Sequence, residues 1–347
     1  MKTKVIKIDK KNIDENLIVE SANVLKSGGL VAFPTETVYG LGANGLDEEA
    51  VKKIYKAKGR PSDNPLILHI SSKEELPPLV ENIPDLAYKC MDEFWPGPLT
   101  MIFKKSKIIP RIITGGLDTV AIRMPSHPIA SQLISKSGVP IAAPSANTSG
   151  RPSPTNANHV IEDMMGKIEV IIDGGNTGVG LESTVLDLST DTPMILRPGG
   201  ITLEDLKEII PNITQDKSII KNDIVPKSPG QKYRHYAPKA EMLLFTGDID
   251  KIIDEINKQV NSLVAQGKKV GVMATEETKD RYSNGLVLVS GSRTNPETIA
   301  ANLFSTIRDF DKENVDIILA EGVSIDNIGM AIMNRMIKAA GGKVINL

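Results

Sequence analysis

Cations, hydroxyls and amides gather in a few short polar segments of the N-terminal part of the chain. Lys58, Arg60 and Asn64 lie within the stretch KGRPSDN, directly after a helical pattern. Lysine and arginine both bind phosphate oxygens, and arginine can do so through two parallel hydrogen bonds. The same residues would also suit a helix end followed by a solvated turn, so this segment alone leaves both interpretations open.

Further polar groups stand at the ends of predicted strands. The loop PTETVYG (34–40) offers two hydroxyls, a carboxylate and a phenol, and AAPSANTSG (142–150) is small and polar. Arg123 ends a predicted strand, and Arg197 precedes Pro-Gly-Gly directly after another. Ligands of α/β proteins bind at such strand ends, where small residues let them approach the backbone. These groups together favour a site for an anionic ligand. His69 lies on another predicted strand, where a structural role is the commoner one.

Two glycine-rich segments imitate nucleotide-binding motifs. GLGANG (40–45) fits GxGxxG, but PTETVY separates it from the preceding strand, whereas the glycine turn of a dinucleotide-binding domain follows its strand directly. GGNTGVG (174–180) lacks the Lys-Ser/Thr ending of a P-loop. A dehydrogenase would therefore rest on one weak match.

Short apolar segments alternate with amphipathic helical patterns, which predicts α/β architecture. Several N-terminal strands are joined by loops too short for a helix, so this sheet should be mixed rather than purely parallel. The spacing after residue 240 predicts a small doubly wound domain. Predicted strands cover residues 4–8, 30–33, 66–70, 99–103, 119–123, 141–143, 170–172, 184–187, 194–196, 242–245, 269–274, 286–289, 317–320 and 344–346, and predicted helices 13–26, 47–57, 249–265, 296–310 and 327–340.

A segment with four prolines and little periodicity, residues 211–238, separates the two alternating regions. It is typical of an interdomain linker but long for a passive tether, and long irregular segments are often functional. We therefore expect an N-terminal domain of residues 1–210, a linker or lid of residues 211–239 and a C-terminal domain of residues 240–347.

Composition narrows the function further. The 347 residues carry a formal net charge of −2, which argues against a protein that mainly coats nucleic acid. A single cysteine excludes an internal disulfide, and the four histidines show no metal-ligand spacing, so no metal held by protein side chains is predicted. The chain shows no signal-peptide pattern and no apolar run near the roughly 18 residues that span a bilayer. We expect a cytoplasmic protein without membrane contact.

Seven motifs, taken in order, resemble the threonylcarbamoyl-AMP synthase family in its long, two-domain form. They are PTETVYGLGANG, KAKGRPSDNPL, AIRMPSHP, PSANTSGRPSPT, ESTVLDL, LRPGGI and SPGQKYRHYAP. The resemblance implies a YrdC-like catalytic domain with a twisted mixed sheet and a concave cavity, and a smaller Rossmann-like α/β domain joined to it by the linker. It also implies a nucleotidyltransferase that makes L-threonylcarbamoyladenylate and pyrophosphate from L-threonine, bicarbonate and ATP with Mg²⁺, for modification of tRNA next to the anticodon.

The resemblance also assigns roles to individual residues. Lys58 and Arg60 would be catalytic cations, and Tyr236 would reach back from the linker to cover the nucleotide. The expected ATP-binding residues are Arg60, Asn64, Thr119, Ser145, Asn147, Ser153, Arg197 and Tyr236. The expected L-threonine-binding residues are Thr37, His69, Arg123, Ala143 (through its backbone) and Ser183. The segment SPGQKYRHYAP would close over ATP as a lid. The product would pass to the tRNA threonylcarbamoyl-transferase complex, with at most weak direct contact to tRNA.

Two alternatives to this enzyme remain besides the dehydrogenase. One is a module that binds double-stranded RNA without turnover. The other is carbamoyl transfer in metallocentre maturation, against which the single cysteine argues, because such proteins resemble larger chains with cysteine-rich zinc modules.

Overall fold

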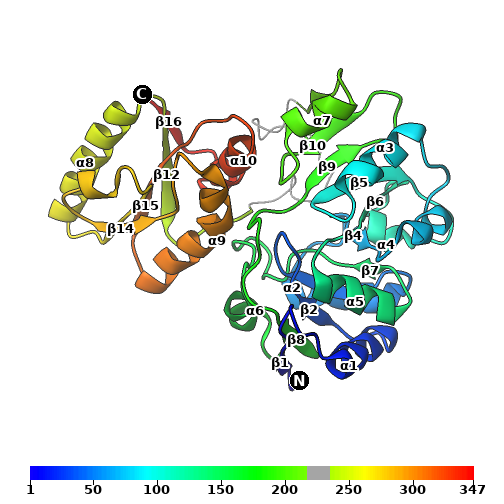
Figure 1. The fold of residues 1–347 in the computed structure, drawn as a ribbon. Helices are drawn as coiled ribbons and strands as arrows, with labels where there is room; N and C mark the ends of the chain where they lie inside the picture. The colour runs from blue at the N-terminus through cyan, green and yellow to red at the C-terminus, as the bar shows by residue number, and fades with distance from the viewer. Residues whose placement is uncertain (217–234) are drawn as a thin grey trace. The chain divides into compact units, whose positions relative to one another are not determined.

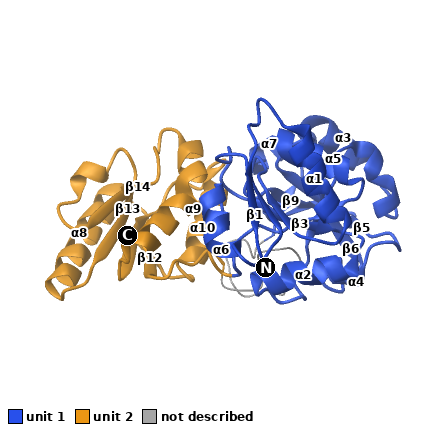
Figure 2. Ribbon diagram, turned by 90° about the horizontal axis from the view of Figure 1, so that it is seen from below, with its two compact units in different colours: residues 1–149, 153–232 blue, residues 150–152, 233–347 orange. Residues whose placement is uncertain are grey.

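The computed structural model describes residues 1–216 and 235–347, which form two units (Figure 2). The first contains residues 1–149 and 153–216, and the second contains residues 150–152 and 235–347. Most of the predicted linker lies outside the described residues, including SPGQKYR, the first part of the predicted lid. Residues 214–215 at its predicted start form a short strand of the first unit.

The first unit is built on one mixed sheet with the strand order β1-β8-β2-β3-β7-β4-β6-β5-β9-β10-β11 (Figure 1). Parallel pairs such as β4–β6 and antiparallel pairs such as β5–β6 occur side by side, which confirms the predicted mixed sheet. Its strands are β1 (Lys4–Lys7), β2 (Val31–Phe33), β3 (Gly40–Asn44), β4 (Ile67–His69), β5 (Leu99–Lys104), β6 (Thr119–Arg123), β7 (Ile141–Ala142), β8 (Val170–Asp173), β9 (Thr184–Asp187), β10 (Met194–Arg197) and β11 (Thr214–Gln215). Its helices are α1 (Glu15–Lys26), α2 (Glu48–Lys58), α3 (Asp85–Phe94), α4 (Arg111–Thr114), α5 (Pro128–Ser137), α6 (Ala157–Met164) and α7 (Leu203–Ile209).

Local sequence explains where α2 begins and ends, and thus where Lys58 stands. The Asp47 side chain accepts hydrogen bonds from the backbone N–H groups of Glu49 and Ala50, which would otherwise be unpaired at the helix start. At the other end Gly59 takes a left-handed conformation with φ 61°, which glycine adopts without steric penalty. Lys58 is therefore the last helical residue, and it enters the interior as the chain turns.

The GxGxxG match is not a phosphate-binding turn, because residues 40–44 form β3, a strand inside the sheet. A Cβ atom on Gly42 would lie 2.8 Å from Cε1 of Phe33 and 2.9 Å from Cγ2 of Ile141. Glycine thus lets the neighbouring strands' side chains close over β3. The dinucleotide-binding alternative loses the one motif on which it rested.

Helices α1 and α5 cover one face of the β1, β8 and β2 side of the sheet. Apolar residues of both helices form a buried cluster with residues of these strands and of β7. Ile18 and Leu25 of α1 and Leu133 of α5 are wholly buried there, each contributing about 1.5–3 kcal/mol relative to exposure. This packing fixes β2 and β7, from which two polar loops of the predicted site emerge.

The second unit is a five-stranded parallel sheet in the order β14-β13-β15-β12-β16. Val270 and Val272 of β13 pack with α8, whereas Phe310 of α9 closes on Gly271 between them, so helices cover both faces (Figures 1 and 2). This confirms the Rossmann-like prediction. The strands are β12 (Glu241–Thr246), β13 (Val270–Ala274), β14 (Leu286–Val289), β15 (Ile317–Glu321) and β16 (Val344–Asn346), and the helices are α8 (Ile249–Ala265), α9 (Pro296–Glu313) and α10 (Gly329–Ala339).

A short piece of the PSANTSGRPSPT motif, residues 150–152, is held within the second unit. The buried Arg308 of α9 donates to the Pro152 carbonyl from Nη2 at 2.7 Å and from Nε at 3.2 Å. The backbone N–H of Ala237 donates to the Gly150 carbonyl at 2.9 Å. The motif is therefore shared between the two units.

None of the helices among residues 1–216 and 235–347 has both the length and the apolar character needed to cross a membrane.

Candidate active site

Three polar side chains stand in a row across the middle of the large sheet. His69 of β4 is in register with Arg123 of β6, and Arg123 is in register with Thr100 of β5. Partners in register point to the same face of a sheet, so the three side chains are neighbours. All three are buried. Strand pairing thus assembles an imidazole, a guanidinium and a hydroxyl from segments far apart in the sequence.

Arg123 is the centre of this row. Its Nη1 donates to Oγ1 of Thr37 at 2.9 Å, its Nε donates to the Gly97 carbonyl at 3.3 Å, and its Nη2 lies 2.6 Å from Oε1 of Glu36. The loop between β2 and β3 is shaped by Thr35, whose hydroxyl bonds both the Thr37 hydroxyl at 2.8 Å and the Val38 carbonyl at 2.6 Å. The polar loop PTET is therefore folded toward Arg123.

A chain of hydrogen bonds continues from β5 to β10. The hydroxyls of Thr100 and Ser183 are 2.7 Å apart. Arg197, at the end of β10, donates from Nη2 to the Ser183 hydroxyl at 3.1 Å and from Nε to the Ser183 carbonyl at 3.0 Å. Two predicted residues, one assigned to threonine and one to ATP, are thus in direct contact.

Lys58 ties the end of α2 to the PSAN loop. Its Nζ donates to the carbonyls of Ser145 and Asn147, the latter at 2.6 Å. The Ser145 hydroxyl in turn donates to Oδ1 of Asn147 at 2.6 Å. Burial, and next the nearby Arg60 cation, hold the pKa of Lys58 well below its usual range. In the structure, Lys58 therefore holds the loop that carries Ser145 and Asn147.

The imidazole of His69 is neutral at ordinary pH. Burial, reinforced by the positive charge of Arg123, lowers its pKa to about 3. A neutral ring beside Arg123 offers a hydrogen bond to a ligand without adding charge.

The remaining first-unit residues of the predicted site lie further along these strands. Thr119 is the first residue of β6, and Arg60 and Asn64 precede β4. Because β4 and β6 are parallel, both strands begin at the same edge of the sheet. Nη2 of Arg60 donates to the Pro65 carbonyl at 3.1 Å. Thr119 is four residues from Arg123, or about 13 Å along an extended strand.

Two predicted residues sit on loops beside the row. The backbone N–H of Ala143 donates to the Ile67 carbonyl at 3.0 Å, next to β4. The Ser153 hydroxyl donates to Oε1 of Glu182 at 2.5 Å, next to Ser183.

Tyr236 is described within the second unit. Its ring stacks on Phe304 of α9 with the centroids 5.0 Å apart, and the guanidinium of Arg335 lies 5.9 Å from its centroid. Its backbone has φ 62°, which is unusual for a tyrosine. The structure brings Tyr236 together with the C-terminal helices, and its role over the nucleotide stays a prediction.

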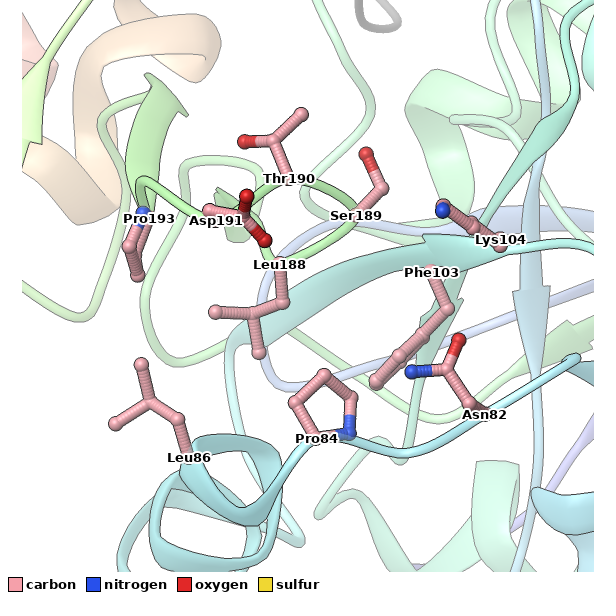
Figure 3. A pocket seen from close by; sticks show the side chains of 10 residues that line it. All are labelled: Asn82, Pro84, Leu86, Phe103, Lys104, Leu188, Ser189, Thr190, Asp191 and Pro193. Carbon is pink, nitrogen blue, oxygen red and sulfur yellow. The ribbon is translucent and has the colours of Figure 1, made fainter.

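A pocket of about 330 Å³ lies elsewhere in the first unit (Figure 3). Phe103 and Lys104 line it from the end of β5 opposite to Thr100. From the β9–β10 turn it is lined by Leu188, Ser189, Thr190, Asp191 and Pro193 (Figure 3). None of the predicted site residues lines it, so we do not assign the reaction to this pocket.

Family models and individual relatives both identify the family of this chain. Residues 23–199 match a family model described as "Telomere recombination", and residues 201–341 match one described as "Threonylcarbamoyl-AMP synthase, C-terminal domain". The chain is 50% identical to a threonylcarbamoyl-AMP synthase of Pyrococcus abyssi over 97% of this chain and 98% of that protein. It is 49% identical to one of Bacillus subtilis over 99% of this chain and 100% of that protein. The chain belongs to the threonylcarbamoyl-AMP synthase family.

A solved structure supports the fold. The crystal structure of P. abyssi Sua5 complexed with L-threonine superposes with a TM-score of 0.95 at 50% identity, covering 99% of this chain and 100% of that one. The predicted family, fold class and enzyme type are confirmed, and the RNA-binding module without turnover is not favoured. The individual residue roles and the domain limits stay predictions.

Sequence reasoning did not assign Glu36 and Thr100 to the site. Glu36 is the neighbour of Thr37 in the loop PTET, so a carboxylate next to a predicted ligand residue was an available signal. Thr100 is one polar residue in the apolar strand β5, and only the strand register shows that it faces Arg123.

Proposed function

We propose that this enzyme joins L-threonine, bicarbonate and ATP into L-threonylcarbamoyladenylate and pyrophosphate through the row of His69, Arg123 and Thr100. The observation that carries the assignment is the unbroken set of contacts from this row through Ser183 to Arg197. It places groups suited to an amino acid beside a cation suited to a nucleotide. The L-threonine complex of the P. abyssi relative supports the threonine end.

The threonine end offers a cation among neutral polar groups. Arg123 would bind the carboxylate of threonine, and the hydroxyls of Thr37 and Ser183 would accompany it. His69 stays neutral there, with its Nδ1 3.2 Å from the Ile67 carbonyl, and would make a polar contact with the substrate without adding charge. The backbone of Ala143 lies beside β4 and would close the pocket around the substrate.

The nucleotide end contains more positive charge. Arg197 would contact the adenylate next to the threonine carbamate, because it already bonds Ser183. The proposed ATP-binding residues of the first unit are Arg60, Asn64, Thr119, Ser145, Asn147, Ser153 and Arg197, and Tyr236 of the second unit would cover the nucleotide.

The chemical step needs charge and alignment rather than a covalent nucleophile. A carbamate oxygen attacks the α-phosphorus and pyrophosphate leaves, so two anions must approach each other. Arg60 and Lys58 would offset this repulsion, and fixed groups of this kind contribute about 2.7–4 kcal/mol each to the barrier. Lys58 would also act through the loop that it holds, since its Nζ bonds two carbonyls of the Ser145–Asn147 turn.

Mg²⁺ would reach the site on the phosphates of ATP. Within the described part of the chain, no group of three or more His, Cys, Asp or Glu side chains is placed to hold a metal ion. Mg²⁺ commonly keeps several waters and binds through substrate phosphates, which fits a site rich in cations and hydroxyls. When bound, it would supply additional positive charge at the phosphates.

The product is a reactive mixed anhydride, and we propose that it passes to the tRNA threonylcarbamoyl-transferase complex. Direct contact with tRNA would be weak, in keeping with the net charge of −2.

The decisive experiment measures pyrophosphate release from ATP and Mg²⁺ while L-threonine and bicarbonate are omitted in turn. We expect release only when both are present, with threonylcarbamoyladenylate identified by mass spectrometry of the fresh mixture. Folded protein that releases no pyrophosphate with all substrates present would overturn the proposal.

A further inference from the structure

Glu36 places a carboxylate against the arginine at the centre of the site. Its Oε1 lies 2.6 Å from Nη2 of Arg123, and the two side chains are 15% and 5% exposed. The backbone carbonyl of Glu36 accepts hydrogen bonds from the N–H groups of Gly178 at 3.1 Å and Val179 at 2.8 Å. The main chain of Glu36 is thus fixed, and its carboxylate is directed into the row of site residues.

This ion pair is close but poorly aligned. Both carboxylate oxygens of Glu36 and Nη2 of Arg123 are buried without a hydrogen-bond partner among the described residues. A buried carboxylate normally accepts several hydrogen bonds, and leaving it short of them costs free energy. Missing hydrogen bonds at the centre of a site indicate that these groups are available to bind a ligand.

Other unpaired polar atoms in the same unit add to this deficit. Nε2 of the buried His127 and Oγ1 of Thr177 also have no hydrogen-bond partner in the described part of the chain. Nδ1 of His127 accepts from the Ile129 N–H, so Nε2 carries the hydrogen. Burial lowers the pKa of His127 to about 4, although the negative charge of Glu36 acts against this shift.

Two other carboxylates of the first unit are already engaged. Oε1 of Glu182 accepts from the Ser153 hydroxyl at 2.5 Å, and Oδ2 of Asp163 accepts from the Thr148 N–H at 3.1 Å. Glu36 is the carboxylate of these three with both oxygens unused for hydrogen bonding.

The chemistry of the substrate requires such a group. At neutral pH threonine carries an ammonium group, which has no lone pair and cannot attack a carbon atom. Arg123 matches the carboxylate of the zwitterion, and a carboxylate matches the charge of its ammonium. If the enzyme makes the carbamate as proposed above, some group must also remove a proton from that ammonium.

We propose that Glu36 binds the ammonium group of threonine and takes one proton from it, which frees the amine to form the carbamate. The Glu36 carboxylate becomes a neutral carboxyl as the ammonium becomes an amine. The amine nitrogen then bonds to the carbon of bicarbonate, and one C–O bond breaks to release water. The neutral carboxyl does not repel the carbamate anion, and it leaves Arg123 free to neutralise the substrate's negative charge.

The test compares Glu36→Gln, which keeps size and hydrogen bonding but removes the charge and the proton acceptor, with Glu36→Asp. Glu49→Gln is the matched control, because Glu49 is exposed on α2 and pairs only with Lys52 in the described residues. For Glu36→Gln we expect kcat at saturating threonine to fall about 100- to 10,000-fold. Glu36→Asp should recover part of this loss, and Glu49→Gln should match the unmodified chain.

A binding experiment separates contact with the ammonium from support of Arg123. Titration calorimetry would compare L-threonine with 2,3-dihydroxybutanoate, in which a hydroxyl replaces the ammonium. The unmodified chain should prefer threonine by about tenfold or more, and Glu36→Gln should lose that preference while ATP affinity stays unchanged. One good charged contact contributes enough for such a ratio.

Three results would overturn the proposal while leaving the synthase activity intact. They are normal turnover by Glu36→Gln, an unchanged preference for threonine in that variant, or an equal loss of affinity for both compounds, which would show that Glu36 only orients Arg123. If Glu36→Gln does not fold, the preference of the unmodified chain for threonine over dihydroxybutanoate and the turnover of Glu36→Asp still test the contact. No pyrophosphate release by the unmodified chain would instead contradict the proposed function.

Discussion

Each unit holds a largely buried arginine–carboxylate pair near the end of a strand, and the two pairs differ in how completely they are hydrogen bonded. In the second unit Arg293 lies 2.7 Å from Glu321, and the Tyr282 hydroxyl donates to the same carboxylate at 2.5 Å. Thr275 donates to it at 3.3 Å. In the first unit Glu36 meets Arg123 with both carboxylate oxygens unpaired by hydrogen bonds among the described residues. Two pairs of the same charges thus differ in hydrogen bonding: the one in the second unit belongs to a satisfied network, and the one in the first unit is the pair that we propose is kept for a ligand.

The contrast has a physical reason, because stabilising a fold and binding a substrate make opposite demands on a buried ion pair. A buried pair stabilises a fold only when its remaining hydrogen-bonding capacity is used within the protein. A binding site must keep some of that capacity for the substrate, and it therefore holds groups in an unfavourable state until the ligand arrives. Substitutions in the first pair should alter kinetics, and substitutions in the second should alter stability.

Among the substitutions that compare the two units, the largest expected effect comes from removing the guanidinium of Arg123. Arg123→Met should lower kcat/KM for threonine about 100- to 1000-fold, because one fixed charge in a dry site contributes about 2.7–4 kcal/mol. The matched change Arg293→Met should leave kcat/KM within a few fold. Steady-state pyrophosphate release measures both. Arg123→Lys distinguishes charge from geometry, since lysine cannot form the paired hydrogen bonds of a guanidinium. If kcat/KM fell less than tenfold in Arg123→Met, the two pairs would not differ in their effect on catalysis.

The second pair should give the reverse pattern. Glu321→Gln removes the negative charge while Arg293 remains, and breaking a buried pair in this way lowers the free energy of unfolding by about 3 kcal/mol. Activity at a temperature where the variant is folded should be unchanged. Urea unfolding followed by circular dichroism measures the loss, with Glu313→Gln, an exposed pair with Lys269, as the control. A large kinetic defect in folded Glu321→Gln would show that the C-terminal network serves the reaction.

Sequence alone predicted most of the strands that carry the site but not how they pair. Residues 99–103, 119–123 and 194–196 were predicted as strands, and the structure has Leu99–Lys104, Thr119–Arg123 and Met194–Arg197. Local apolar patterns determine such elements. Register is non-local, so no pattern within one strand shows that Thr100 faces Arg123.

A missed strand of the site and the missed carboxylate have different causes. β3 (Gly40–Asn44) is rich in glycine, which weakens a strand pattern, and its glycines are explained only by Phe33 and Ile141 packing over them. Glu36 can be read directly from the loop PTET. What sets it apart is that neither of its carboxylate oxygens has a hydrogen-bond partner among the described residues. An unused hydrogen-bonding group becomes apparent only once every neighbouring partner has been placed.

A pH series should sharpen the contrast, because burial in the site prevents His69 from taking up a proton in mild acid. Its pKa is about 3 in the folded chain against 6.5 for the unfolded group, so the unfolded state binds the proton more readily. The stability that this provides is complete above pH 6.5 and is lost as the pH falls toward 3. Between pH 7 and pH 5 the loss from this residue should be about 2 kcal/mol.

Urea unfolding of the unmodified chain and of His69→Asn at pH 7, 6 and 5 measures this contribution. We expect the stability of His69→Asn to fall less steeply with acid, by the stated amount, because asparagine does not titrate. Parallel pH curves for the two proteins would mean that His69 is already protonated or exposed, and that the site is less dry than the burial of its side chain indicates.

The smallest expected effect compares two single hydroxyls. Thr100→Val keeps the shape of a buried residue but removes the 2.7 Å hydrogen bond to Ser183. A net loss of about 1 kcal/mol should appear as a roughly fivefold higher KM for threonine with kcat nearly unchanged. Tyr282→Phe removes the 2.5 Å bond to Glu321 and should lower unfolding free energy by a similar amount without a kinetic effect. If both variants lost only stability, Thr100 would belong to the supporting structure and the substrate-facing row would end at Arg123.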